Sequence, residues 1–289
     1  MEKPELLFFS KFSCELFEAD NFRSMTRHHY HDAYEIFFPV AGKRYMAFNG
    51  VRQLLQRGTI FIAQPFVPHG SECHESGYYK RYTLNFSRND LCALFSDEEI
   101  DAVTSRLSTG VYQLSEKQTD KLEACLERIA DYHARFGDLA RKLTLMQLFL
   151  TLEYLNSLLE AQQLSPASDT PPLLGTHPAV ALAMDYVKLH YAEAVDLAFM
   201  ASHVHLSKSQ FCRVFRLTTG TTFLQFLNSY RLSRAHAMIS HTKKPLHGIA
   251  EATGFYTTEH MTRTFEKTYH MSPSDWRRSY TSRSTQGQS

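Results

Sequence analysis

Four side chains in the first quarter of the chain have types that suit binding chemistry: His29, His31, Glu35 and His69. Residues 29, 31 and 35 share parity, so in one extended strand their side chains would lie on the same face. Three imidazoles and a carboxylate can ligate zinc, iron, manganese or nickel. The same groups can bind a small organic ligand by hydrogen bonds, or serve as structural histidines. The sequence leaves these three interpretations open.

A second set of candidate residues lies near the other end of the chain, where one pattern occurs twice. Small and apolar residues recur at an offset of 49 residues before a turn and 50 after it, and the two copies contain Met200, Ala201, Leu206, Phe211 and Phe215, then Ile249, Ala250, Phe255, Met261 and Phe265. Each copy has helical spacing on both sides of the turn. The repeat therefore predicts two helix-turn-helix units.

The second helix of each unit has an apolar face and a polar, cationic face, because positions three and four apart stack along a helix. Arg213 and Arg263 lie at the centres of the two polar faces, and an arginine can bond a guanine edge in two places. Lysines nearby would meet phosphates, which position a protein on DNA without specifying sequence. The predicted DNA-binding residues are Lys208, Ser209, Gln210, Cys212, Arg213, Arg216, Thr258, Glu259, Thr262, Arg263 and Lys267.

These two units need a spacer that holds them at a fixed separation. Residues 223–240 form a helical run with an apolar stripe at Phe223, Phe226, Leu227 and Tyr230, continued by Ala237 and Met238. At 1.5 Å per residue this helix would span roughly 27 Å. Two recognition helices at its ends could therefore lie about one DNA turn, roughly 34 Å, apart.

The carboxyl-terminal part resembles the AraC/XylS-type transcription regulators, whose DNA-binding domain has two helix-turn-helix units joined by such a helix. The resemblance is carried by VHLSKSQFCRVFRLTTGTTFLQFLNSYRLSRA, IAEATGF and HMSPSDWRR. The family usually has Gly at the position of His270 and Tyr at that of Trp276. By this resemblance, Ser209, Arg213, Thr258, Glu259, Thr262 and Arg263 match positions that face bases.

The amino-terminal histidines resemble the first cupin motif, with His69 as the expected fourth ligand. The second motif fits less well, since Phe66, Val67 and Pro68 stand where Gly normally follows the proline, and Cys73 takes the usual Asn position. The resemblance implies a barrel that binds a small effector, a sugar in many family members. The predicted effector-binding residues are His29, His31, Glu35, His69 and Tyr82, with Arg27 and Arg44 as further donors; if a metal binds, its ligands are His29, His31, Glu35 and His69.

Two kinds of element surround these amino-terminal residues. Short aromatic and β-branched runs at 34–40, 45–48, 59–63 and 79–86, separated by turn signals that include Asn49-Gly50, predict a barrel or sandwich over residues 1–90. From 97 to 163 the pattern becomes helical, with stripes at Leu122, Cys125, Leu126 and Ile129 and at Leu143, Met146, Phe149, Leu150 and Leu158. Two antiparallel helices packed on the barrel would account for both stripes. Family members commonly dimerise through helices at this place, so the resemblance also implies a dimer interface here.

Charge divides the chain in the same way as the patterns do. Residues 177–289 contain 13 Lys and Arg against 7 Asp and Glu, while residues 1–176 contain 18 against 23. A basic module beside an acidic one suits phosphate binding at one end only. Five cysteines without C-x-x-C spacing suggest neither a disulfide framework nor structural zinc, and no apolar run is long enough to span a membrane. We therefore expect a soluble, cytoplasmic protein.

The sequence predicts an α+β protein with a cupin-like effector-binding and dimerisation domain (1–165), a linker (166–176), an all-α DNA-binding domain (177–281) and a disordered tail (282–289). Its expected function is transcription regulation by sequence-specific binding to double-stranded DNA, controlled by a small molecule, with a sugar favoured. A homodimer is expected, with RNA polymerase as a further partner if the protein activates. We expect no cofactor and no enzymatic activity; a metal-dependent cupin enzyme or a metal-sensing regulator is the alternative.

Overall fold

The computed structural model describes residues 5–7, 12–20, 29–48, 51–73, 77–161, 165–166, 177–219 and 221–278. Its contacts divide the chain into two compact units, residues 1–175 and 176–289. The first is built on β-sheets and the second consists of helices, which confirms the predicted α+β class. Most of the predicted linker, the whole predicted tail and the Asn49-Gly50 turn lie outside the described residues, so these limits stay predictions.

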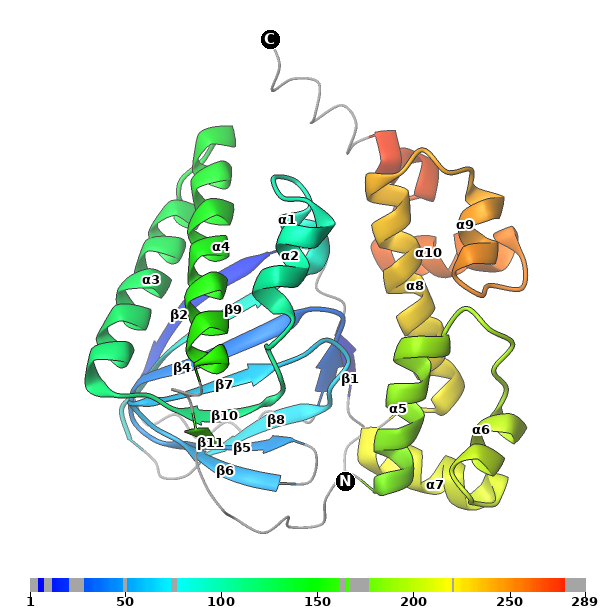
Figure 1. Cartoon of the computed structure of the whole chain (residues 1–289), viewed down its shortest axis with the longest axis horizontal. Coiled ribbons are helices and arrows are strands. Elements are labelled where there is room, and N and C mark those ends of the chain that lie inside the picture. Colours follow the sequence, from blue (N-terminus) through cyan, green and yellow to red (C-terminus); the bar gives the residue numbers. More distant parts are fainter. Residues whose placement is uncertain are drawn as a thin grey trace. The chain divides into compact units, whose positions relative to one another are not determined.

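The first unit contains two sheets that face each other (Figure 1). One has the order β1-β3-β8-β5-β6, and its strands are β1 (Glu5–Leu7), β3 (His29–His31), β8 (His69–Cys73), β5 (Arg44–Phe48) and β6 (Val51–Leu55). The other has the order β11-β10-β7-β4-β9-β2, with β11 (Ser165–Pro166), β10 (Gly110–Gln113), β7 (Thr59–Ala63), β4 (Tyr34–Ala41), β9 (Tyr79–Phe86) and β2 (Ser13–Ala19). All four predicted strand runs are present. The described strands form two separate sheets and not one closed barrel.

Each sheet contributes to a core between the two layers. Phe37, Phe61 and Tyr79 of the six-stranded sheet pack with Met46 and Phe48 of the five-stranded sheet. Alternation of inward and outward side chains along the strands produces this arrangement, since successive residues point to opposite faces. Histidine and glutamate residues at one end of the same inner space form the candidate site described below.

Helices cover the other face of the six-stranded sheet. They are α1 (Arg88–Leu91), α2 (Asp97–Thr104), α3 (Glu116–Ala134) and α4 (Asp138–Glu160), and α3 and α4 form the predicted antiparallel pair. Leu122, Leu126 and Ile129 of α3 are buried as predicted. The predicted stripe of α4 is wrong at Met146 and Leu150, which are exposed, whereas Leu158 is buried and Phe149 packs against the core as predicted. The buried face of α4 instead contains Leu145, Leu148, Leu152 and Leu155.

The second unit is all-α. Its elements are α5 (Pro178–His190), α6 (Leu197–His203), α7 (Lys208–Thr219), α8 (Phe223–His241), α9 (Leu246–Ala252) and α10 (Thr258–Tyr269). The predicted spacer helix is α8, which begins at a capping box formed by Thr222 and Gln225. The second half of its predicted stripe is shifted, because Leu232, Ala235, His236 and Ile239 are the buried residues there. Ala237 and Met238 are only half-buried.

The two copies of the repeat have the same turn geometry. In the first, the Leu206 amide bonds the Ala201 carbonyl at 2.9 Å, and in the second the Phe255 amide bonds the Ala250 carbonyl at 2.9 Å. Both turns also contain a residue with positive φ, His205 in the first and Gly254 in the second. The sequence repeat is therefore a structural repeat of two helix-turn-helix units. No described helix combines the length and apolarity needed to cross a bilayer.

Candidate functional site

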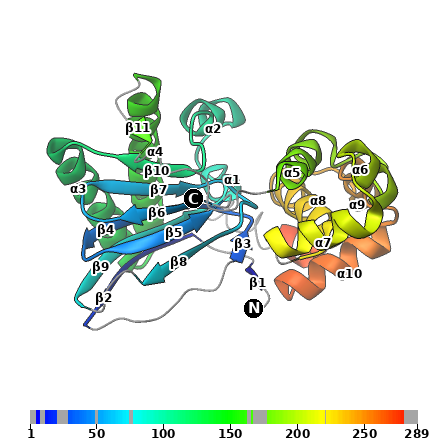
Figure 2. The ribbon, with the colours of Figure 1, turned by 90° about the horizontal axis from the view of Figure 1, so that it is seen from below.

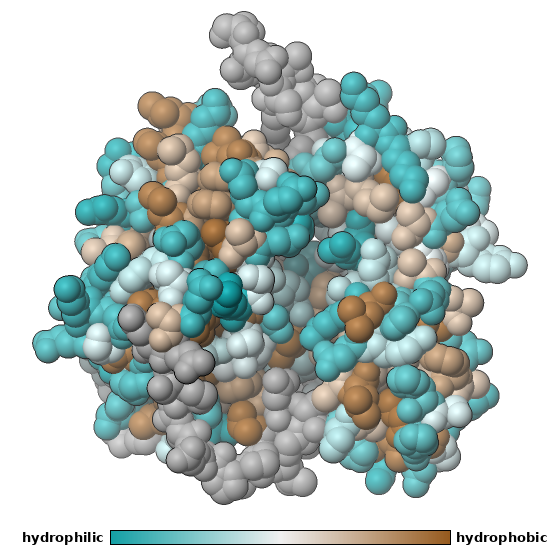
Figure 3. All heavy atoms as spheres, in the orientation of Figure 1, coloured by the Kyte–Doolittle hydropathy of each residue, from teal (hydrophilic) through white to brown (hydrophobic). Residues whose placement is uncertain are grey.

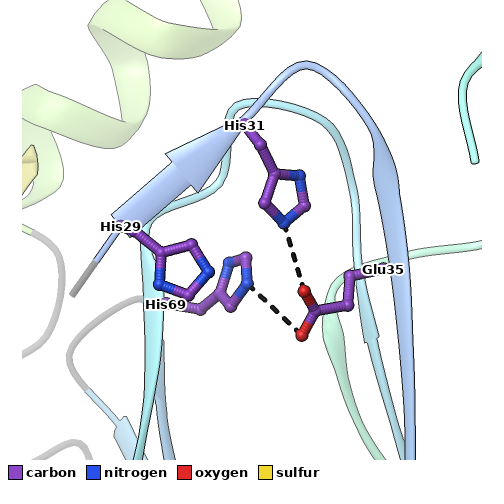
Figure 4. A group of neighbouring side chains, drawn as sticks. All are labelled: His29, His31, Glu35 and His69. Atoms are coloured by element: carbon purple, nitrogen blue, oxygen red, sulfur yellow. Dashed lines mark hydrogen bonds and ion pairs between the residues drawn. The ribbon is translucent and has the colours of Figure 1, made fainter. Parts of the chain in front are cut away.

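The four amino-terminal candidates come together although they do not share a strand. His29 and His31 lie on β3, the chain bends at residues 32–33, and Glu35 lies on β4 of the other sheet. His69 begins β8 and lies directly opposite His29 in the antiparallel register. The prediction of one continuous strand is wrong, but the predicted grouping of the side chains is present. Figure 4 shows all four pointing toward one another.

Hydrogen bonds to the backbone fix the orientation of two of the imidazoles. His31 Nδ1 lies 2.8 Å from the carbonyl oxygen of Ala33, and His69 Nδ1 lies 2.8 Å from that of Val67. A carbonyl oxygen can only accept, so each Nδ1 must carry the proton. The Nε2 atoms then face Glu35, at 3.3 Å for His31 and 3.7 Å for His69. Backbone support of this kind is typical of imidazoles that act as ligands.

The Glu35 carboxylate is buried in this group. Burial by itself would raise its pKa, but the hydrogen bond from His31 and the neighbouring His69 ring outweigh burial and hold the pKa of Glu35 well below its usual range. Burial opposes protonation of His69, yet the nearby Glu35 carboxylate raises the pKa of the His69 imidazole. The carboxylate therefore stays ionised and attracts positive charge to the centre of the group.

The donor set fits a metal ion. One ligand atom from each of the four residues can be chosen so that all lie within 4.8 Å of one another. His69 Nε2 is buried and has no hydrogen-bond partner within the described part of the chain. Three imidazole nitrogens and one carboxylate oxygen are the ligands that zinc and other first-row transition metals prefer. These residues would hold the ion, and the ion would supply a concentrated positive charge.

The loop before His69 keeps a glycine-like conformation without a glycine. Phe66 has φ 65°, in the left-handed region, and its amide bonds the His31 carbonyl at 2.6 Å. Phe66 stands where the second cupin motif normally has Gly. The conformation is nevertheless the one that glycine accommodates best. The turn still carries His69 to the other three side chains.

The remaining predicted effector contacts do not join this group. Tyr82 lies on the opposite face of the six-stranded sheet, in the core beneath the helices. Arg44 is buried at the far end of β5 from Phe48, the residue opposite His69. Its guanidinium bonds the Ser71 carbonyl and lies 5.3 Å from the centre of the Tyr79 ring. Arg27 lies outside the described residues.

The second candidate site is a pair of exposed helix faces in the second unit. Figure 2 shows α7 and α10 on the same side of α8, and Figure 1 shows them near its opposite ends. Both helices contact α8. Arg213 and Arg263 are exposed, and neither forms an ion pair within the described part of the chain. Both predicted recognition helices therefore present a free cationic side chain.

The inward faces of these helices are as predicted. Phe211 and Phe215 of α7, and Met261 and Phe265 of α10, are fully buried. Ser207 and Gln210 form a capping box before α7, and the Thr257 hydroxyl accepts a bond from the His260 amide at the start of α10. The side-chain oxygen of Gln210 therefore already accepts hydrogen bonds within this capping box. The other predicted DNA-binding residues are exposed or half-buried: Lys208, Ser209, Cys212, Arg216, Thr258, Glu259, Thr262 and Lys267.

A surface hollow runs along α10. Its lining residues are Thr257, Thr258, Glu259, His260, Thr262, Arg263 and Glu266. Four of them are predicted DNA contacts, so the structure gathers these side chains at one place. Tyr256 precedes the hollow and is 97% exposed, which is unusual for a ring of this size. Sequence reasoning missed Tyr256, and its place next to the predicted cap was the only available signal.

Two arginines outside the predicted set fix the arrangement of the second unit. Arg231 of α8 donates to the carbonyls of Tyr191 and Glu193, at 2.7 and 2.8 Å. Arg277 donates to the Ile239 and Lys244 carbonyls at 3.2 and 2.8 Å. Each arginine ties a loop or terminal segment to the spacer helix. The sequence alone contained no signal for these roles, because the acceptors are backbone atoms distant in the chain.

Comparison with known proteins agrees with this division. Residues 12–149 match the family model of an AraC-like ligand binding domain, and residues 200–279 match that of a helix-turn-helix domain. A ligand-binding domain followed by a helix-turn-helix domain defines the general class of protein. The two matches together cover most of the chain, and the chain belongs to the AraC/XylS-type transcription regulators.

Individual relatives are more distant. The regulatory protein PocR of Salmonella typhimurium is 30% identical over 95 residues, 33% of this chain and 31% of PocR. Uncharacterised helix-turn-helix regulators of Staphylococcus aureus are 26% identical over 166 residues, 56% of this chain and 21% of theirs. The chain thus matches about a third or less of the length of these relatives. The crystal structure of ToxT from Vibrio cholerae is similar with a TM-score of 0.39 and 12% identity, covering 92% of this chain and 96% of ToxT.

Proposed function

We propose that this protein is a sequence-specific DNA-binding transcription regulator whose amino-terminal unit binds a small-molecule effector. The observation that carries the proposal is the pair of exposed, cationic faces of α7 and α10, which lie on the same side of one rigid spacer helix. A helix of 19 residues is roughly 28 Å long. This length suits two recognition helices in successive major-groove segments of one duplex, about one turn apart.

Within these faces the side chains divide by chemistry. Arg213 and Arg263 can donate two parallel bonds to a guanine edge. Neighbouring hydroxyl and carboxylate groups can read other bases, and these are Ser209, Thr258, Glu259 and Thr262. Lys208, Arg216 and Lys267 are positioned at exposed sites where they can neutralise phosphates. Specificity would then come mainly from Arg213 and Arg263, and general affinity from Lys208, Arg216 and Lys267.

The test is a comparison of arginine variants on a selected operator. Arg213→Ala or Arg263→Ala should weaken specific binding by roughly 1 to 3 kcal/mol and relax the base preference at one position. Arg57→Ala is the matched control, because Arg57 is an exposed arginine of the first unit that pairs with Asp120 and Glu123. An unchanged footprint and affinity for Arg213→Ala would show that α7 does not read bases.

The effector is the less constrained part of the proposal. The family resemblance favours a carbohydrate, which would bind at the group formed by His29, His31, Glu35 and His69. Tyr82 cannot supply the aromatic face of such a site, because it lies in the core beneath the helices. A thermal-shift screen of sugars on the purified protein tests this class directly. An increase in unfolding temperature that disappears in His29→Gln would support it.

We also propose that the protein acts as a homodimer through α4. Leu139, Met146 and Leu150 are 71%, 51% and 60% exposed and lie at spacings of seven and four, so they share one face of this helix. Hydrophobic residues are visible along α4 in Figure 3. Exposed apolar faces on a helix commonly mark protein contacts, and a second copy offers the same face about a two-fold axis.

Location and further partners follow from the same proposal. A regulator that binds operator DNA must act in the compartment that holds the DNA, which is the cytoplasm of a bacterial cell. RNA polymerase would be a partner if the protein activates transcription. A reporter assay with the operator placed upstream of a promoter distinguishes activation from repression.

A further inference from the structure

We propose that His29, His31, Glu35 and His69 form a binding site for a divalent transition-metal ion. The inference deepens the proposed function, since it names a ligand class for the amino-terminal unit, and only the interpretation of the ion as part of the effector site rests on that function. Binding of the ion itself follows from the geometry of the four side chains.

The distances are close to those of a coordinated ion. Two ligand atoms that each lie about 2.1 Å from a metal can be at most about 4.2 Å apart. The four chosen ligand atoms lie within 4.8 Å of one another, so a closure of roughly half an ångström brings them into range. Rotation of half-buried His29 or of the Glu35 carboxylate is enough to provide this closure. The strands need not move.

The orientation of the imidazoles also favours an ion. The Ala33 and Val67 carbonyls accept the Nδ1 protons of His31 and His69. The lone pairs that ligate a metal therefore belong to the two Nε2 atoms, which both point to the Glu35 carboxylate (Figure 4). In the hydrogen bond between His31 Nε2 and Glu35, at 3.3 Å, a proton lies between the nitrogen and the carboxylate. A metal ion can take the place of that proton and bond to both Nε2 atoms and the carboxylate at once.

Burial decides between an ion and a larger molecule as the direct occupant. His31 and His69 are each 1% exposed and Glu35 is 6% exposed. Side chains this deeply enclosed cannot each reach a different hydroxyl of a sugar ring, but they can share one ion. His29 is half-buried and lies at the accessible side. Four protein ligands leave up to two positions of an octahedral ion free, where oxygen atoms of an organic effector could bind.

The test is a titration of the full-length, chelator-treated protein with Co²⁺, followed by absorption spectroscopy and elemental analysis. We expect one cobalt ion per chain, ligand-field absorption bands, and displacement by Zn²⁺ at comparable concentration. Mg²⁺ should not displace the ion, because it prefers an all-oxygen site. The unfolding temperature of the first unit should rise by several degrees with bound ion, since the ion binds the folded state only.

Variants assign the binding to these residues. Glu35→Gln and His69→Gln should abolish the absorption bands. Because these side chains are buried, the variants could fail to fold, so half-buried His29→Gln provides a second measurement. It should lower cobalt affinity by roughly tenfold or more and leave the circular dichroism of the protein unchanged. His247→Gln is the matched control, since His247 is exposed in the second unit. It should bind cobalt as the unmodified protein does.

Failure of this proposal can be distinguished from failure of the proposed function. Operator binding is measured on the same protein samples by footprinting. Cobalt binding below one tenth of an equivalent per chain, or equal affinity of His29→Gln and the unmodified protein, would overturn the metal site whatever the DNA result. Stoichiometric cobalt that binds more weakly to His29→Gln supports the site even if the protein binds no DNA, and in that case only the regulator function is wrong.

Discussion

Gly254 packs the turn of the second helix-turn-helix unit against the segment that follows α5. It has φ +75°, and an added Cβ would lie 2.7 Å from the Tyr191 carbonyl oxygen and 2.9 Å from Cα of Ala192. Both contacts are with backbone, which cannot rotate away. The Tyr191 carbonyl is also bonded by Arg231 of the spacer helix. Gly254 is therefore packed directly against a segment that is held in place from another direction.

Replacement of Gly254 by alanine should destabilise the second unit in two ways. The left-handed conformation costs an alanine roughly 1 to 2 kcal/mol. The short contacts with the backbone of residues 191–192 add the cost of an overpacked site, roughly 1 to 3 kcal/mol. We expect a total loss of roughly 2 to 5 kcal/mol from the free energy of unfolding. Any relief by movement of α9 and α10 would displace the second recognition helix.

Trp276 provides the assay. It is the single tryptophan of the chain, and it packs in the second unit against His236, Phe265 and Tyr269. Urea unfolding followed by its fluorescence therefore reports on this unit alone. The midpoint should fall strongly in Gly254→Ala, and a footprint should lose the half-site read by α10 before that read by α7.

Gly137→Ala is the matched control for this experiment. Gly137 has φ +106°, but an added Cβ meets nothing within 4 Å, and it lies in the first unit. The control keeps the unfavourable backbone conformation without the close approach. Unfolding of the first unit, followed by circular dichroism, measures the control. If Gly254→Ala lowers the free energy of unfolding of the second unit no more than Gly137→Ala lowers that of the first, the contact of Gly254 with residues 191–192 does not stabilise the second unit.

Three further predictions concern acid stability, assembly and the core. Burial lowers the pKa of His236 to about 3, so below pH 6.5 the unfolded state binds a proton that the folded state does not. The free energy of unfolding should therefore decrease as the pH is lowered, by about 1.6 kcal/mol between pH 6.5 and 5. Unfolding followed by Trp276 fluorescence should show a smaller decrease in His236→Phe, and an equal decrease would contradict the role of His236. Met146→Glu combined with Leu150→Glu should convert a dimer to a monomer in sedimentation at micromolar concentration, whereas exposed Leu189→Glu should not; an unchanged mass would exclude α4 as the interface. Leu148→Ala, at a fully buried position, should cost roughly 2 to 5 kcal/mol in the unfolding of the first unit, and a loss below 1 kcal/mol would contradict the assigned burial of α4.

The helix-turn-helix units were predictable because their residues satisfy several local rules at once. Phe211 and Phe215 have helical spacing, Ser207 is a cap, and the same pattern returns about 50 residues later. Short strands with clear turn signals were predictable for the same reason. Local signals that agree with the final packing leave few alternatives.

The face of α4 was not predictable from periodicity. This helix carries leucine or another large apolar residue on nearly every side, so several stripes can be drawn through it, and the chosen one contains exposed Met146 and Leu150. Only packing against α3 and the sheet selects Leu148 and its neighbours. Contacts between distant segments decide such cases, because the sequence pattern fits more than one orientation.

The sequence predicted which four residues form the candidate metal site, but not which strands hold them. His29, His31 and Glu35 share parity, but a bend between them places Glu35 in another sheet. Phe66 adopts a conformation that its residue type disfavours. His270 does the same at the end of α10, with φ 54°, where the family usually has Gly. The residue types at both positions depart from the family patterns, but the backbone at both positions has the positive φ that Gly would adopt.

The rigid spacer α8 has a consequence for the spacing of any operator. One base pair inserted between the two half-sites moves one of them by about 3.4 Å along the duplex and rotates it by about 35° around the axis. A continuous helix that is bonded to both units cannot lengthen or twist to follow. Insertions of one base pair should therefore be as harmful as changes in the contacted bases, and the distance between half-sites becomes part of the recognised sequence.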